Sequence, residues 1–181
     1  MATDGRRRTV CALVFLFCVA CGGSPTPTAA PSPSGGSEAL RANYVALIHR
    51  YWLGIVAADN ATATTNEASS ACLGTRTASS PRDAALVDPA KCRVRAVAIL
   101  AVQQQFLDDL AMTVAPRQFA DDDKVFRSQV PRAIAALKTL VAAAATGKKQ
   151  ATLDAASAYA DIMLSAVIGA LDDVDPSVHH Y

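Results

Sequence analysis

Several residue types are scarce in this chain of 181 residues, and their scarcity argues against some classes of function. Aromatic residues make up 6% of the sequence, charged residues make up 18%, and the formal net charge is only +1. The sequence contains no long basic or acidic block. Because nonspecific binding to nucleic acid needs a clustered positive surface, we expect no nucleic-acid partner.

Residues that bind metals or haem are also scarce. Glutamate occurs only at Glu38 and Glu67, and neither forms the Glu-x-x-His motif of di-iron bundles. The only histidine outside the C-terminal tail is His49, which a helical wheel places away from the centre of its helix's apolar face. The Cys-x-x-Cys-His motif of covalent haem attachment is absent. The sequence therefore predicts no metal site and no cofactor.

Apolar periodicity indicates helices and no strands. Hydrophobic residues make up 51% of the chain and alanine is abundant, a composition that favours helices. Asp88 followed by Pro89 is typical of a helix start, and Ser80 followed by Pro81 indicates a short helix. Pro131 lies inside one apolar stripe, so that helix should kink or begin there. Four long helices are expected, over about 38–58, 89–115, 121–146 and 152–173.

The simplest architecture that buries four apolar stripes is an up-and-down four-helix bundle. The sequence thus predicts an all-α fold with one bundle domain over residues 38–181. We recognise no known family for this part of the chain.

The N-terminal segment has the features of an export signal. Arg6, Arg7 and Arg8 precede an apolar run from Val10 to Ala20, which is too short to span a bilayer comfortably. The sequence then continues Cys18-Val19-Ala20-Cys21, which resembles the bacterial lipobox. Ala20 and Cys21 match the lipobox pattern, whereas Cys18 stands where leucine is usual.

This resemblance covers about the first two dozen residues. It implies a signal peptide over residues 1–20, lipid modification of Cys21, and a mature protein that begins at Cys21 and is held to a membrane of the cell envelope. An ordinary cleaved signal and an uncleaved N-terminal anchor are the alternatives. The arginines also partly resemble a twin-arginine signal, so the export route stays open.

The segment after Cys21 is rich in proline, glycine and serine. Residues 22–37 contain almost no apolar side chains to bury, so we expect this segment to be disordered. The chain is therefore predicted to hold a lipidated cysteine and flexible linker over residues 21–37.

Two cysteines remain once the signal and the lipidated residue are set aside. Cys72 and Cys92 would meet an oxidising compartment after export, so a structural disulfide is the favoured interpretation. A redox pair usually has closer spacing, and a zinc site needs further ligands nearby.

Gln103 is unexpected because it lies near the middle of an apolar stripe. A buried amide without a hydrogen bond destabilises the fold by about 1–3 kcal/mol. Tyr44 and Tyr51 lie on the inward face of the first long helix, so we expect their hydroxyls as partners for Gln103. The simpler interpretation is a hydrogen bond that fixes helix register, and the alternative is the polar wall of a ligand pocket.

Trp52 lies at the edge of the apolar stripe on the first helix. A partly exposed tryptophan can anchor a partner surface, and it can equally seal the end of a bundle.

Three functional hypotheses follow. The leading one is a non-catalytic, lipid-anchored module that contacts an envelope protein or the cell wall. The second is a bundle that binds an apolar or amphipathic small molecule in its core. An enzyme is least favoured, because the only inward-leaning titratable candidates are tyrosines rather than a nucleophile beside a histidine base.

Overall fold

The computed structural model describes residues 34–62, 72 and 81–180. The chain divides into two units, Met1–Ser32 and Pro33–Tyr181, and the described residues all belong to the second. The predicted signal peptide, the predicted lipidation site Cys21 and most of the predicted linker lie outside the described residues. The fold below is that of the second unit.

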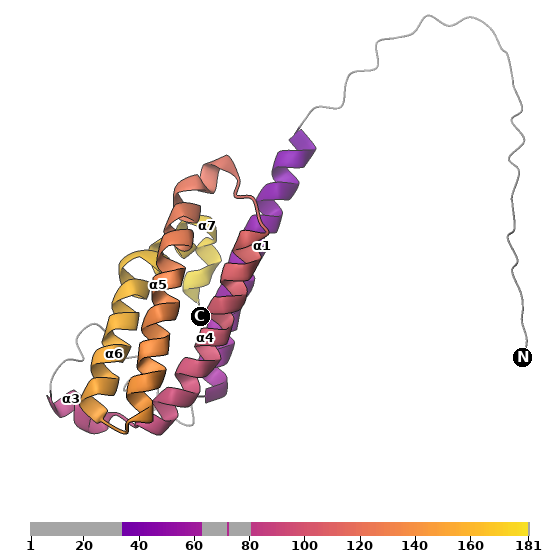
Figure 1. The fold of residues 1–181 in the computed structure, drawn as a ribbon. Helices are drawn as coiled ribbons and strands as arrows, with labels where there is room; N and C mark the ends of the chain where they lie inside the picture. Colours follow the sequence, from indigo (N-terminus) through magenta and orange to yellow (C-terminus); the bar gives the residue numbers. More distant parts are fainter. Residues whose placement is uncertain (1–33, 63–71, 73–80, 181) are drawn as a thin grey trace, which may run out of the picture. The chain divides into compact units, whose positions relative to one another are not determined.

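Every element that the described residues form is helical, which confirms the predicted all-α class (Figure 1). The elements are α1 (Ser34–Thr62), α3 (Pro81–Leu86), α4 (Pro89–Ala111), the 3-10 helix η1 (Arg117–Phe119), α5 (Ala120–Ala145), α6 (Lys149–Ile162), the π-helix η2 (Met163–Val167), α7 (Ile168–Val174) and the 3-10 helix η3 (Pro176–His180).

Local sequence signals account for several of these boundaries. The carboxylate of Asp88 accepts hydrogen bonds from the backbone N–H groups of Ala90 and Lys91, at 3.0 and 3.2 Å, and so caps α4 as predicted. Gly147 has a positive φ of 71°, the conformation that favours glycine after a helix end.

The helices differ from the sequence-based expectation in several places. α1 ends at Thr62 rather than near residue 58, and α4 ends at Ala111 rather than near residue 115. α1 begins at Ser34, so its first four residues belong to the predicted linker. α5 runs without interruption through Pro131. Proline has no N–H to bond the carbonyl four residues earlier, that of Arg127, but both residues are exposed, so water can solvate this carbonyl. The fourth predicted helix is divided by the π-helix η2, a local widening that apolar periodicity does not reveal.

The long helices lie side by side around one apolar core (Figure 1). α4 packs between α1 and α5, and α5 packs in turn against α6. α1 also touches α7, although this contact is much less extensive than its contact with α4. The side of the core between α1 and the C-terminal helices is therefore the least tightly closed.

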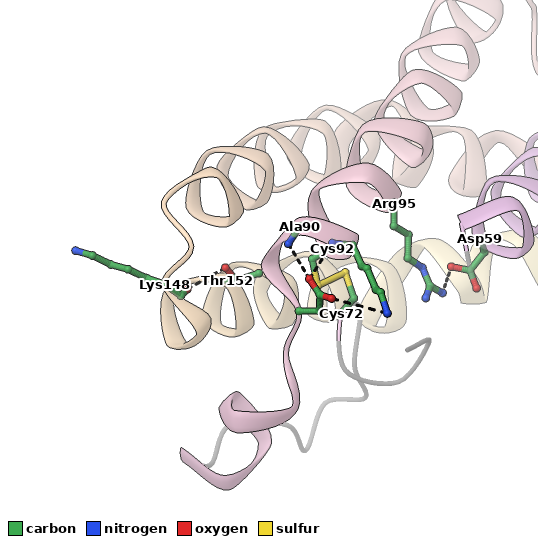
Figure 2. Close-up of a disulfide and its surroundings, with 9 residues drawn as sticks. Asp59, Cys72, Ala90, Cys92, Arg95, Lys148 and Thr152 are labelled. Carbon is green, nitrogen blue, oxygen red and sulfur yellow. Dashed lines mark hydrogen bonds and ion pairs between the residues drawn. A yellow bond between two sulfur atoms is a disulfide. The ribbon is translucent and has the colours of Figure 1, made fainter. Parts of the chain in front are cut away.

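A second, smaller apolar cluster lies at the start of α4. Figure 2 shows the disulfide between Cys72 and Cys92 in this cluster, close to the beginning of α6. The Cα atoms of the two cysteines are 5.0 Å apart, within the usual range for a disulfide. The other buried members are Ala84, Val87, Ala144 and Leu153.

The segment Lys149–Val174 is long and apolar enough to cross a membrane by length and composition alone. In the described residues it packs against α5 and carries a large share of the core, including Leu153, Ala156, Val167 and Leu171. Burial of this face explains its apolar character without a membrane.

Loss of the disulfide should weaken the fold. The bond closes a loop with a sequence separation of 20, and a loop of this length stabilises a protein by about 3 kcal/mol through restriction of the unfolded chain. The double variant Cys72→Ala with Cys92→Ala should therefore lose about this much free energy of unfolding in urea. Reduced wild-type protein should behave like the variant. Equal stability of the oxidised and reduced proteins would contradict the disulfide.

The close approach of α1 to α4 at Gly54 should tolerate no side chain. A Cβ at this position would lie 2.9 Å from Cγ1 of Val102, a stiff β-branched side chain. Gly169 is the matched control, because a Cβ there would have no neighbour within 4 Å. Gly169→Ala should stabilise its helix by roughly 0.5–1 kcal/mol. Gly54→Ala should be less stable than Gly169→Ala by about 1–3 kcal/mol in thermal unfolding, and equal stabilities would disprove the steric argument.

Candidate functional site

A cleft of about 280 Å³ lies on the loosely closed side of the core, between α1, α4 and the C-terminal helices. We call it the Trp52 cleft. Apolar side chains form most of its surface, and a few polar groups meet among them. Its lining residues are Trp52, Ile55, Asp59, Arg95, Ile99, Tyr159, Ala160, Met163, Leu164 and Ile168.

The π-helix η2 forms one wall of this cleft. Met163 and Leu164, its first two residues, both line the cleft, and Met163 is buried whereas Leu164 is exposed. A π-turn inserts one extra residue into a helix, and such turns are frequent at functional sites. This wall is therefore shaped differently from a regular helical surface.

Trp52 contributes an indole N–H that has no hydrogen-bond partner, although this nitrogen is buried. An unpaired buried donor destabilises the fold by about 1–3 kcal/mol. From its sequence context, Trp52 is a candidate anchor for a partner surface. In the structure Trp52 lines a cleft. Trp52 is the only tryptophan of the chain.

Gln103 is fully buried behind the cleft and joins α4 to α6. Its amide nitrogen donates to the Tyr159 hydroxyl at 3.1 Å and contacts the Met163 sulfur at 3.5 Å. Gln103 does not itself line the Trp52 cleft. The hydrogen bond that connects two helices fits the simpler interpretation of this residue, while Tyr159 carries the polar network to the surface of the cleft.

The predicted partners of Gln103 need correction. Tyr44 is not a partner, because its hydroxyl donates to Asp123 Oδ1 at 3.0 Å, on another side of the core. Tyr51 stacks on Phe106 with ring centroids 3.9 Å apart, and its buried hydroxyl meets no partner with hydrogen-bond geometry. The Gln103 amide nevertheless lies close enough to lower the pKa of Tyr51, so Tyr51 is a neighbour of Gln103 rather than its direct partner. The true partner, Tyr159, lies in an alanine-rich stretch of α6 where periodicity gave it no special weight.

The two buried tyrosines near Gln103 stay protonated at neutral pH. Burial raises the pKa of Tyr159 to about 12, although the hydrogen bond with Gln103 opposes part of this rise. Burial also raises the pKa of Tyr51, and the nearby hydroxyl of Tyr159 adds to the effect, whereas the Gln103 amide opposes it. Both side chains therefore act as neutral hydroxyls rather than as bases.

Arg95 and Asp59 form an ion pair at one end of the cleft. Figure 2 shows Arg95 extending from α4 toward Asp59 of α1, about one helical turn beyond Cys92. Arg95 is buried, and this burial lowers the pKa of its guanidinium. Asp59 is about one-third exposed, so the pair sits at the boundary between the core and solvent.

A histidine, an aspartate and a serine meet elsewhere, which the sequence did not predict. His49 Nδ1 lies 2.7 Å from Asp175 Oδ2, and the Ser177 hydroxyl donates to Asp175 Oδ1 at 2.6 Å. A hydrolase needs the serine beside the histidine base, but here the serine donates to the aspartate. The backbone N–H of Ser177 donates to the same oxygen, so Asp175 caps η3. Asp175 therefore has a structural explanation: it caps η3 with one carboxylate oxygen and contacts His49 of α1 with the other.

Other candidate sites are less well supported. A larger cleft of about 420 Å³ lies between α1 and α4, but its Gln105 and Asp109 side chains already bond to each other. Within the described residues, no group of three or more His, Cys, Asp or Glu side chains gathers as metal ligands. The acidic start of α5 is partly neutralised, because Lys124 pairs with Asp121 and Arg127 pairs with Asp123.

Comparisons with protein-family models, with curated proteins and with solved structures give no match for this chain. The functional argument therefore depends on the geometry of the chain's own residues.

Asp175 should make stability depend on acid pH. Burial raises its pKa, but hydrogen bonds from the Ser177 hydroxyl, His49 and the Ser177 backbone outweigh this effect, so the pKa lies below its ordinary value. The resulting stabilisation is complete above the pKa of the unfolded chain, about 3.9, and is lost as the pH falls through the lower folded-state value.

Asp175→Asn should therefore be less stable than wild type at pH 6, and the difference should shrink as the pH falls from 4 to 2, in urea unfolding at each pH. Asp108→Asn is the control, because Asp108 is exposed and has no bonded partner among the described residues. A difference that persists unchanged at pH 2 would contradict the argument.

Proposed function

We propose that this chain is a lipid-anchored, non-catalytic module of the bacterial cell envelope that holds a small amphipathic molecule in the Trp52 cleft. One observation carries the binding role: Trp52, whose buried indole N–H has no hydrogen-bond partner, is one of the residues that line an apolar cleft. Ligand pockets typically combine apolar walls with a few converging polar groups. The cleft volume of about 280 Å³ lies near the lower end of such pockets and fits a small ligand.

The anchor rests on the sequence. Cys21 follows an apolar run and small residues in the manner of a lipobox, and the first described helix begins at Ser34. The positions differ by 34 − 21 = 13 residues, which in extended form reach about 45 Å. A lipid on Cys21 would thus hold the helical unit near a membrane while leaving the cleft open to the surroundings.

An envelope-protein partner remains the second candidate. Val94 and Val97 on α4 are 62% and 49% exposed, and together with Ala90 and Arg93 they line a shallow groove. These two exposed valines on one helix face are the feature of α4 to which such a partner would bind, although they form a much smaller apolar surface than a typical protein interface. No buried polar group lines this groove, so its residues indicate the chemistry of a partner less specifically than the residues of the Trp52 cleft indicate that of a ligand.

Native mass spectrometry of the full chain, expressed in a bacterium and extracted from its membranes in mild detergent, tests both parts of the proposal. We expect a covalent mass for a chain that begins at a lipidated Cys21, and an additional mass that leaves on denaturation. Cys21→Ser should lack the lipid. A chain that retains residues 1–20 without lipid would disprove the anchor. A lipidated chain that carries no ligand and binds none of the probes described below would disprove the binding role.

A further inference from the structure

The hydrogen-bonding groups of the Trp52 cleft restrict the chemistry of its ligand, and this inference rests on the proposed binding function. Trp52 offers an indole N–H without a partner. The Tyr159 hydroxyl accepts a hydrogen from Gln103, and no described group accepts the hydrogen that the hydroxyl itself carries. Two residues that line the cleft therefore carry a neutral hydrogen-bond donor without an acceptor.

The acceptors of the cleft are already engaged. The carboxylate of Asp59 pairs with Arg95, and the sulfur of Met163 is contacted by the Gln103 amide. Sulfur is in any case a weak acceptor. Apart from the Asp59 carboxylate, whose charge is balanced by Arg95, the lining side chains carry no strong acceptor. A ligand that pairs with the Trp52 and Tyr159 donors must therefore bring an acceptor of its own.

The rest of the cleft is suited to an alkyl chain. Its apolar wall comes from α1, α4, α6, η2 and α7 and consists of Ile55, Ile99, Ala160, Leu164 and Ile168. A volume of about 280 Å³ corresponds to roughly nine groups of the size of a water molecule, or to a chain of about eight carbon atoms with its head group.

We infer that the Trp52 cleft binds a medium-chain acyl compound whose carbonyl or carboxylate oxygen accepts hydrogen bonds from the Trp52 indole and the Tyr159 hydroxyl. The acyl chain then contacts the aliphatic wall. A carboxylate head gains further from the nearby Arg95 guanidinium, whereas an ester carbonyl depends on the two neutral donors alone. The indole nitrogen is closed to water in the free protein, so Trp52 must shift when the ligand binds.

Octanoate, methyl octanoate and octylamine are the probes, because they share a chain and differ in the head group. Each is added to the full mature chain in mild detergent, and binding is followed by native mass spectrometry and by the fluorescence of Trp52. We expect the acid or the ester to bind and change the fluorescence, and octylamine to bind at least tenfold more weakly, because an ammonium group lacks an acceptor. Preference for the acid or for the ester identifies the form of the head group.

Tyr159→Phe removes the hydroxyl that would donate to the ligand, and with it the acceptor of the Gln103 amide hydrogen bond. It should weaken binding of the acyl probes about fivefold to tenfold, the usual effect of one hydrogen bond, and its helical circular dichroism must be checked beside it. Tyr44→Phe is the matched control, because its hydroxyl bonds to Asp123 away from the cleft, and it should leave binding unchanged. Trp52→Phe, read by mass spectrometry, tests the second donor independently if Tyr159→Phe loses its helical circular dichroism.

Three results would overturn the inference. Octylamine binding as tightly as the acyl probes, or Tyr159→Phe and Trp52→Phe both binding like wild type, would disprove the acyl head group while leaving a binding cleft in place. Failure of all three probes to bind a chain that also carries no ligand from the cell would overturn the inference together with the proposed binding function.

Discussion

The hydrogen bond from Gln103 to Tyr159 is the constraint on which the interior depends. A buried amide nitrogen must find a partner, and the one on α4 reaches the Tyr159 hydroxyl only when α6 lies at one height along it. The carbonyl oxygen of the same amide is buried without a partner. That height brings Met163, and with it the start of the π-helix, against the same amide. The bond also uses the acceptor side of the Tyr159 hydroxyl, so the hydroxyl remains a donor at the cleft. Core register and cleft chemistry are thus set by the same polar contact.

The sequence predicted the parts of the fold that depend on local chemistry. Apolar periodicity identified the long helices because one face of each must be buried, and the Asp88–Pro89 pair marked the start of α4 because its side chain satisfies backbone N–H groups. Periodicity reports which face is inward but not which side chains meet across the core. Tyr44 and Tyr159 are both inward tyrosines, and only the three-dimensional packing decides that Gln103 meets the second.

The site was predictable only in part for the same reason. Trp52 and Gln103 stood out as residues at odds with their surroundings, whereas Tyr159, Arg95 and Asp59 did not. The contact between His49 and Asp175 joins residues 126 positions apart, and no spacing rule links them. The π-helix was also missed, because the buried residues Met163, Val167 and Leu171 follow one another at intervals of four, a spacing that a regular α-helix also gives.

The disulfide makes the full stability of the fold depend on oxidation of the two thiols. Cys92 lies in the first turn of α4, and Arg95 follows about one turn later (Figure 2). The disulfide between Cys72 and Cys92 therefore restrains the end of α4 that supplies the arginine of the ion pair with Asp59. In a reducing compartment the two thiols stay separate. A newly made chain would therefore reach its full stability only after it meets an oxidant.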